Sequence, residues 1–174
     1  MLSKVLVPYL LPVFGLKNGI HAYHFLIDEL FFKEFENGII SNGTVEMDVV
    51  LDKRQDMMVF EFTFEGIIEA ECDRCLVPIN LPIKGNNKLI VKYSETVKED
   101  DGEVVFVDPN VNSFSIAQYA YEFILLAVPI LRRYDCASDQ NPPCDMEMLQ
   151  RLKEQVIEED TNPAWDVLKG LSDN

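Results

Sequence analysis

Polar and apolar residues alternate with a period of two over much of the first 94 residues, which is typical of β-strands with one buried face. In "TVEMDVVLD" (44–52) every second residue from Val45 onward is apolar. The same alternation continues through "MMVFEFTFEGIIEAEC" (57–72). The polar stretch "KRQD" separates the two segments, so they predict an antiparallel hairpin. Gly66 lies inside the longer segment and could permit a bend or a bulge there.

Two more apolar segments flank Gly85-Asn86-Asn87, which is a turn signal. The sequence therefore predicts a strand at 77–83, a turn, and a strand at 88–93. Pro78 and Pro82 share one face of the first of these strands, which favours an edge position because proline cannot donate a ladder hydrogen bond. The other elements predicted before residue 94 are a strand at 21–28 and a short helix at 29–35.

Helical spacing begins after residue 113. Ser115 and Gln118 fit a capping box at the start of a helix that ends before Pro129. The segment 145–160 is amphipathic, and Asn162-Pro163 predicts the start of a last short helix. Together the elements predict an α+β fold: an antiparallel β-sheet, open or curled into a partial barrel, followed by C-terminal helices. The chain is interpreted as one domain, 1–174, with a mainly β part (1–108) and a helical part (113–174) that contains a cysteine loop (132–145).

Charge narrows the range of partners. The net charge is −15, and residues 135–174 alone carry ten acidic and three basic side chains. Such a chain repels nucleic-acid phosphate unless its basic groups gather on one face, and it favours a basic protein partner. The simpler interpretation is that the charge keeps the protein soluble.

The apolar N-terminus superficially suggests a signal peptide. Pro8 and Pro12 interrupt it, and no small-residue cleavage site follows. The longest later apolar run, "FILLAVPIL" (123–131), is too short to cross a bilayer. We therefore expect a soluble cytosolic protein with reduced thiols, and no membrane partner.

Four cysteines are the main candidates for chemistry. Cys72 and Cys75 have the C-x2-C spacing of a zinc knuckle, in which two thiolates on one tight turn reach the same ion. Cys136 and Cys144, in "CASDQNPPC", could supply the other two ligands. The expected site is a closed, structural zinc that joins the end of the β part to the helical part.

Two alternatives stay open at the cysteines. Cys72 continues the apolar face of its strand, so the thiols could be unligated, buried small residues. A redox pair of the thioredoxin type is disfavoured, because that motif lies at a helix N-terminus. Here the pair follows a strand, and the neighbouring Glu69, Glu71 and Asp73 oppose thiolate formation.

No catalytic residue is predicted. His21 and His24 are the only histidines, and a strand would direct them to opposite faces. The chain lacks a G-x-S-x-G elbow, a P-loop and a Rossmann fingerprint, and Glu122 is more simply a helix-edge residue than a general base. We expect no small-molecule substrate and no cofactor other than the candidate zinc.

Two surface groups are candidates for partner binding. The polar face of the long strand carries glutamates, joined by acids of the preceding strand, and it could accept a basic protein. The alternative is that Lys84, Lys88 and Lys92 pair with these acids across strands. Arginines near the cysteines could form a small basic spot. The candidate partner-binding residues are Glu61, Glu65, Glu69, Glu71, Arg74, Arg132 and Arg133.

Several motifs in order along the chain carry a family resemblance: "FEGIIEAECDRCLVPI", "YEFILLAVPI", a cysteine loop, and "NPAWDVLKGL". Over roughly residues 40–171 the sequence resembles the bacterial YceD family, also called the large ribosomal RNA subunit accumulation protein family. The resemblance implies a bacterial cytoplasmic role in the synthesis, processing or stability of large-subunit ribosomal RNA, and no enzymatic activity is established for the family. The wide spacing of Cys136 and Cys144 departs from the denser cluster of some family members.

The resemblance and the charge together predict a non-catalytic ribosome-biogenesis factor. We expect it to bind a basic ribosomal protein or assembly factor, with large-subunit ribosomal RNA as a further candidate partner. The alternatives are a metal-dependent RNA-processing enzyme and a zinc-free protein–protein adaptor. The enzyme is disfavoured because a zinc closed by four cysteines leaves no position for substrate.

Overall fold

A computed structural model describes residues 3–35, 38–94, 104–136, 139 and 141–155, which belong to two compact units. Unit 1 comprises residues 1–71 and 78–132. Unit 2 comprises residues 72–77 and 133–174. The second unit thus combines a short excursion between two strands with the C-terminal part of the chain.

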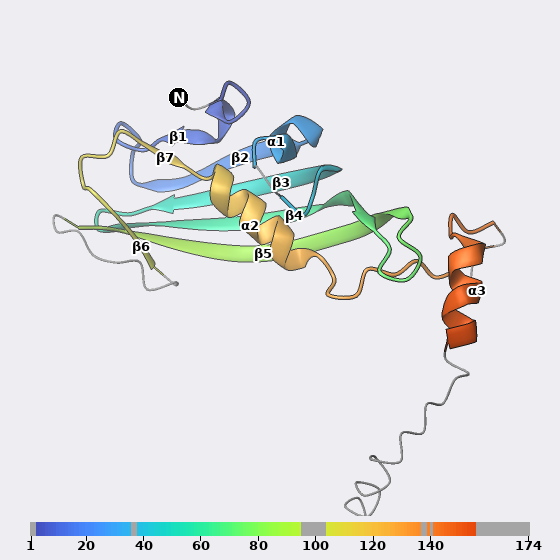
Figure 1. The fold of residues 1–174 in the computed structure, drawn as a ribbon. Coiled ribbons are helices and arrows are strands. Elements are labelled where there is room, and N and C mark those ends of the chain that lie inside the picture. The colour runs from blue at the N-terminus through green and yellow to red at the C-terminus, as the bar shows by residue number, and fades with distance from the viewer. Residues whose placement is uncertain (1–2, 36–37, 95–103, 137–138, 140, 156–174) are drawn as a thin grey trace, which may run out of the picture. The chain divides into compact units, whose positions relative to one another are not determined.

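Unit 1 is built on an open five-stranded sheet in the order β2-β3-β4-β5-β6 (Figure 1). Neighbouring strands are antiparallel except β5 and β6, which are parallel. Within the described residues the sheet does not close into a barrel, and the α+β class is confirmed. The strands are β2 (Gly19–Ile27), β3 (Asn42–Lys53), β4 (Met57–Glu71), β5 (Pro78–Tyr93) and β6 (Val104–Val107).

The hairpin predicted from alternation is confirmed as β3 and β4, which pair over the whole length of β3. The turn predicted at Gly85-Asn86-Asn87 is wrong, because β5 runs through it without interruption. Gly85 lies opposite Phe64 on β4, and a Cβ at residue 85 would lie 2.5 Å from the Phe64 ring. The glycine makes room for an aromatic ring, and the Asn86 amide donates to the Thr63 hydroxyl at 3.0 Å.

Gly66 allows the backbones of β3 and β4 to pack closely. The register of both strand pairs is continuous through it, so the strand has no bulge there. It pairs with Val45 on β3 and Ile83 on β5. A Cβ on residue 66 would lie 2.3 Å from the Thr44 carbonyl oxygen and 2.6 Å from the Val45 Cα. The strands β3 and β4 can approach this closely only because residue 66 has no side chain.

The core lies on one face of the sheet, which we call the inner face. Helix α2 (Ala117–Ala127) crosses this face (Figure 1), with Ala120 and Ile124 fully buried. The Phe123 ring of α2 meets the Phe62 ring of β4 edge-on at 5.0 Å. A two-stranded sheet of β1 (Leu10–Pro12) and β7 (Ser113–Ser115) adds Phe114, which stacks on Phe60 at 5.3 Å.

Two short helices complete unit 1. The 3-10 helix η1 (Val7–Tyr9) places Tyr9 against Phe25 of β2, with ring centroids 4.9 Å apart. Helix α1 (Glu29–Lys33) is capped by Asp28, whose carboxylate accepts from the Leu30 and Phe31 amides. This helix confirms the one predicted at 29–35.

The start of α2 differs from the predicted capping box. Ser115 belongs to strand β7, and the N-cap is Ile116, which makes no side-chain cap hydrogen bond. Gln118 donates to Glu122 one turn later, at 2.9 Å. The capping box fails because pairing of β7 with β1 takes up the backbone of Ser115. The predicted end before Pro129 is confirmed.

Unit 2 contains α3 (Met146–Gln155), which confirms the start of the predicted amphipathic helix. The Asp145 carboxylate caps it by accepting from the amides of Glu147 and Met148 at 2.9 and 3.1 Å. The end of the predicted segment 145–160 and the helix predicted after Asn162-Pro163 lie outside the described residues.

Candidate functional site

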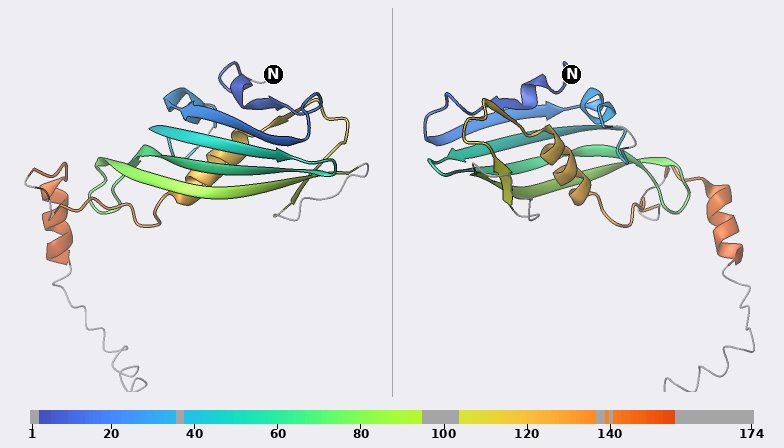
Figure 2. Two further views of the ribbon diagram at one scale, coloured as in Figure 1. Left: turned by 180° about the vertical axis from the view of Figure 1, so that it is seen from behind. Right: turned by 60° about the vertical axis from the view of Figure 1, so that its left-hand side comes forward.

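The second face of the sheet, the outer face, is exposed within unit 1. Figure 2 (left) shows this face in front, with α2 behind the sheet. Its side chains are the polar half of the alternation, together with apolar residues such as Ile67, which is 52% exposed, and Leu26, which is 61% exposed. A sheet face that no described element of its own unit covers is a surface on which a partner can lie.

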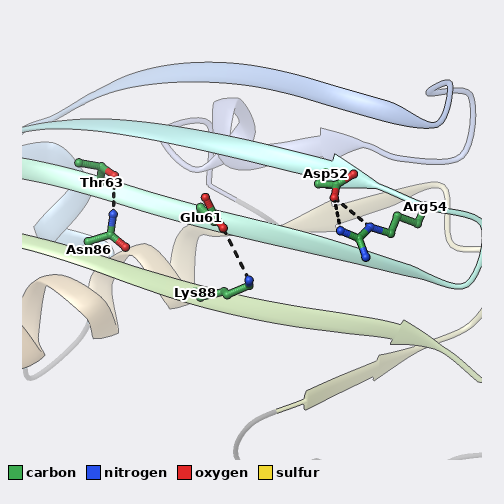
Figure 3. Close-up of polar contacts among 6 residues, drawn as sticks. All are labelled: Asp52, Arg54, Glu61, Thr63, Asn86 and Lys88. Atoms are coloured by element: carbon green, nitrogen blue, oxygen red, sulfur yellow. Dashed lines mark hydrogen bonds and ion pairs between the residues drawn. The ribbon is translucent and has the colours of Figure 1, made fainter.

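Three acids of the outer face already have cationic or imidazole partners. Glu61 pairs with Lys88 across β4 and β5 at 3.6 Å (Figure 3). Asp52 accepts two hydrogen bonds from Arg54 at 2.6 and 2.9 Å (Figure 3). His24 Nδ1 lies 2.8 Å from Asp48. The cross-strand pairing with lysine, expected as the alternative to a binding surface, is confirmed among the described residues for Glu61 and Lys88 alone.

Four other acids have no such partner. No side-chain hydrogen bond or ion pair joins any of their carboxylates to a described residue, and they form the carboxylate strip: Glu46, Glu65, Glu69 and Glu71. Glu46 and Glu65 are direct Cα partners across β3 and β4. Like charges directly opposite each other destabilise a sheet, so a cationic partner would relieve this repulsion.

Two shallow cavities lie along the strip. One of about 660 Å³ is lined by Asp48, Thr63 and Asn86, and one of about 720 Å³ by Thr44, Ile67 and Pro82. Glu46, Glu65 and Lys84 line both. The outer face is therefore hollowed where the unpaired carboxylates of Glu46 and Glu65 face each other. Ile67 and Pro82 form an apolar shelf on one side of this hollow.

In unit 2, the C-x2-C pair lies on a tight turn. The Leu76 amide donates to the Cys72 carbonyl at 2.8 Å, and the Cys72 amide donates to the Val77 carbonyl at 3.0 Å. Cys72 and Cys75 are buried free thiols. Leu76 has φ of 60° and is 61% exposed, so the turn holds a branched residue in the left-handed region that favours glycine.

The surroundings of Cys72 favour a thiolate. Burial raises the pKa of the thiol, but hydrogen bonds from the backbone of Tyr134, Arg74 and Cys75 and from the Cys75 side chain lower it to a net value of about 7. Hydrogen bonds that converge on a sulfur stabilise its anionic form, which is also the form that binds metals. The turn thus has the chemistry of two metal ligands.

The other two predicted ligands are joined to each other. Cys136 and Cys144 form a disulfide, so the expectation of reduced thiols is wrong for this pair. Their Cα atoms are 6.8 Å apart, at the upper end of the usual range for a disulfide. Among the described residues, no three His, Cys, Asp or Glu side chains are arranged to hold a metal ion. In this oxidised form only Cys72 and Cys75 of the four cysteines are free thiols, which is half of the ligand set of a four-cysteine site.

The three predicted arginines occupy different environments. Arg74 is half-buried in unit 2, and its guanidinium lies 2.8 Å from the Cys136 sulfur, with its Nε buried and without a hydrogen-bond partner among the described groups. Arg132 is the last residue of the second segment of unit 1, and Arg133 belongs to unit 2. Arg74 therefore contacts the cysteine loop, and a basic spot formed with Arg132 and Arg133 stays a prediction.

Replacing Leu76 tests the strain in the cysteine turn. We expect Leu76→Gly to raise the free energy of unfolding by about 1 kcal/mol, because glycine adopts positive φ without a steric penalty. Leu76→Ala keeps the penalty and should change stability by less than about 0.5 kcal/mol. Urea denaturation followed by circular dichroism measures both, and a destabilised Leu76→Gly variant would contradict the strain.

Sequence reasoning named the acids of the outer face but could not separate the paired ones from the strip. That separation depends on register, which places Lys88 within reach of Glu61 and leaves Glu46 facing Glu65. The strain at Leu76 was also missed, since leucine carries no signal for positive φ. A glycine at that position would have carried one.

The described residues define a small α+β protein with an open, charged sheet face and a second unit rich in cysteine. The family model described as large ribosomal RNA subunit accumulation protein YceD matches residues 60–172, and the chain belongs to that family. The match contains β4 from Phe60 onward, the whole of β5 and α2, and all four cysteines, and it confirms the resemblance in the motifs. No curated protein and no solved structure matches the chain.

None of the described helices is both long enough and apolar enough to cross a bilayer.

Proposed function

We propose that this protein supports the accumulation of large-subunit ribosomal RNA by binding a basic ribosomal protein or assembly factor, without catalysing a reaction. One observation carries this proposal: the outer sheet face holds four carboxylates that make no ion pair with a described residue. The description of the family supplies the link to the large subunit.

Charge favours a protein partner over direct contact with RNA. At −15 the whole chain repels phosphate, whereas a cationic protein is attracted from a distance and held near the strip. The C-terminal part, with ten acidic and three basic residues in 135–174, is repelled by the strip for the same reason. The effect on ribosomal RNA would then follow from delivering or protecting a basic protein during assembly.

Affinity purification from cells, with identification of both protein and RNA across a salt series, tests this proposal. We expect a basic ribosomal protein or assembly factor to be recovered at low salt and lost as salt rises, because screening weakens exposed charge pairs. A variant with the four strip residues changed to glutamine should recover less of it. Recovery of ribosomal RNA alone, resistant to high salt and without a basic protein, contradicts the proposal.

We also propose that Cys72, Cys75, Cys136 and Cys144 bind a structural zinc ion once a dithiol has reduced the Cys136–Cys144 disulfide. The turn at Cys72 supports this, since backbone donors there stabilise a thiolate. Arg74 also supports it, because its guanidinium beside the Cys136 sulfur would offset the negative charge of four thiolates. A site closed by four sulfurs stabilises the fold and offers no position to a substrate.

Metal analysis of reduced protein tests the zinc proposal. We expect one zinc ion per chain in the wild type. Cys75→Ser and Cys136→Ser should each lose the metal together with several kcal/mol of stability, since zinc binding and folding are coupled. Absence of zinc from freshly purified, reduced protein would select the zinc-free adaptor. A folded Cys75→Ser variant that fails only in an RNA-processing assay would instead support a catalytic metal.

A further inference from the structure

We propose that the outer face binds an extended segment of a basic protein, laid along β4 with its side chains in register with the carboxylate strip. The inference rests on the proposed function only for the basic character of the partner. It adds the conformation of the bound segment and the pattern of its residues.

The pattern follows from strand geometry. Glu65, Ile67, Glu69 and Glu71 lie on the same face of β4, because side chains two residues apart point the same way. Each step of two residues is about 6.7 Å along a strand. An extended peptide has the same rise, so its alternate side chains can match these positions one to one.

The bound segment would therefore carry a basic residue, an apolar residue, a basic residue and a basic residue at alternate positions. The apolar residue would lie over Ile67 and the shelf formed with Pro82, which line the larger cavity. The first basic residue would lie between Glu46 and Glu65, whose backbones are direct partners. A cation there interacts with two carboxylates at once, which relieves their mutual repulsion.

Competing occupants are disfavoured by charge. A second copy of the chain carries the same strip, and the acidic C-terminal residues are repelled by it. RNA phosphate is repelled as well. Lys84 is the Cα partner of Glu65 and lines both cavities, yet it makes no ion pair with a described residue. It would repel an incoming cation, so its removal should strengthen binding.

The full-length protein and a labelled seven-residue peptide test the inference. The probe is Arg-Ser-Leu-Ser-Arg-Ser-Arg, and the control peptide has the same composition with its three arginines adjacent. Fluorescence anisotropy at low salt should show tighter binding of the probe than of the control. The glutamate variants form a matched pair on one strand: Glu65→Gln should weaken binding about fivefold, and Glu61→Gln, whose residue is already paired with Lys88, less than twofold.

A third variant is expected to strengthen peptide binding, whereas the two glutamate variants weaken it. Lys84→Met should tighten binding about twofold to threefold because it removes a competing cation. No binding of the probe, equal binding of the two peptides, or equal effects of Glu61→Gln and Glu65→Gln would overturn the inference. Tighter binding of an oligouridylate than of the peptide would overturn it in favour of RNA.

These outcomes are separable from those of the proposed function. If cells yield a basic partner but the peptide does not bind, the protein acts on basic proteins through another surface. If the peptide binds but cells yield no basic partner, the face recognises the pattern and the proposed function fails.

Discussion

Gly66→Ala is expected to lower the free energy of unfolding by about 3 kcal/mol, near the upper end of the usual cost of overpacking a core. A Cβ at this position would lie 2.3 Å from the Thr44 carbonyl oxygen and 2.6 Å from the Val45 Cα. Both atoms are backbone, so no side-chain rotation relieves the contact. Relief requires β3 to move away from β4, which weakens the ladder that joins them.

Two neighbouring variants serve as controls for Gly66→Ala. Gly85→Ala meets the end of the Phe64 ring, which can shift, so a cost of about 1 kcal/mol is expected. Ile67→Ala removes an exposed side chain and should cost less than about 0.5 kcal/mol. Urea denaturation monitored by far-ultraviolet circular dichroism measures all three. If Gly66→Ala proves no less stable than Ile67→Ala, the close approach of the two strands is wrong.

Phe62→Ala is expected to cost about 4 kcal/mol, the usual scale for a phenylalanine removed from a core. The side chain is 0% exposed, and its ring meets Phe123 of α2 at 5.0 Å and Phe60 at 6.4 Å. The truncation therefore leaves a cavity between the sheet and α2. It also removes a contact that holds the helix on the inner face.

The loss of stability depends on how much of the phenylalanine volume the replacement side chain still fills. Phe62→Leu fills most of the volume and should cost less than about 1.5 kcal/mol. A change of Thr63→Val on the outer face, next in sequence, should change stability by less than about 0.5 kcal/mol. Thermal or urea unfolding distinguishes these variants. Equal effects at residues 62 and 63 would contradict the assignment of inner and outer faces.

The long strands could be predicted because one physical signal dominates there. Burial of a single sheet face requires apolar residues at every second position, and β3 and β4 show this alternation over most of their length. The short strands β1, β6 and β7 have three or four residues each, too few for any period to emerge. Their pairing depends on tertiary contacts.

Errors arose where one residue type serves two physical purposes. Glycine followed by two asparagines is typical of a turn, but Gly85 here accommodates the Phe64 ring in the middle of a strand. Ser115 resembles a helix cap, but strand pairing takes up its backbone. In both cases the deciding contact comes from a residue distant in sequence, so a local pattern could not reveal it.

The candidate site was partly visible in the sequence. The acids of the outer face follow from alternation alone, whereas the distinction between Glu61 and Glu65 requires the register of three strands. The cysteine turn follows from the C-x2-C spacing. Its thiolate-stabilising donors include the backbone of Tyr134, which spacing within the motif could not indicate.

Each unit is formed by two separate segments of the chain, so a truncated chain can keep one segment of a unit and lose the other. The chain crosses between the units at residues 71–72, 77–78 and 132–133. A fragment that stops at residue 132 keeps the excursion with Cys72 and Cys75 but loses the rest of unit 2. These thiols, 0% and 3% exposed in the whole chain, would become accessible to oxygen and to each other in neighbouring molecules. Deletion studies should therefore carry serine at both positions, so that lost activity is not confused with covalent aggregation.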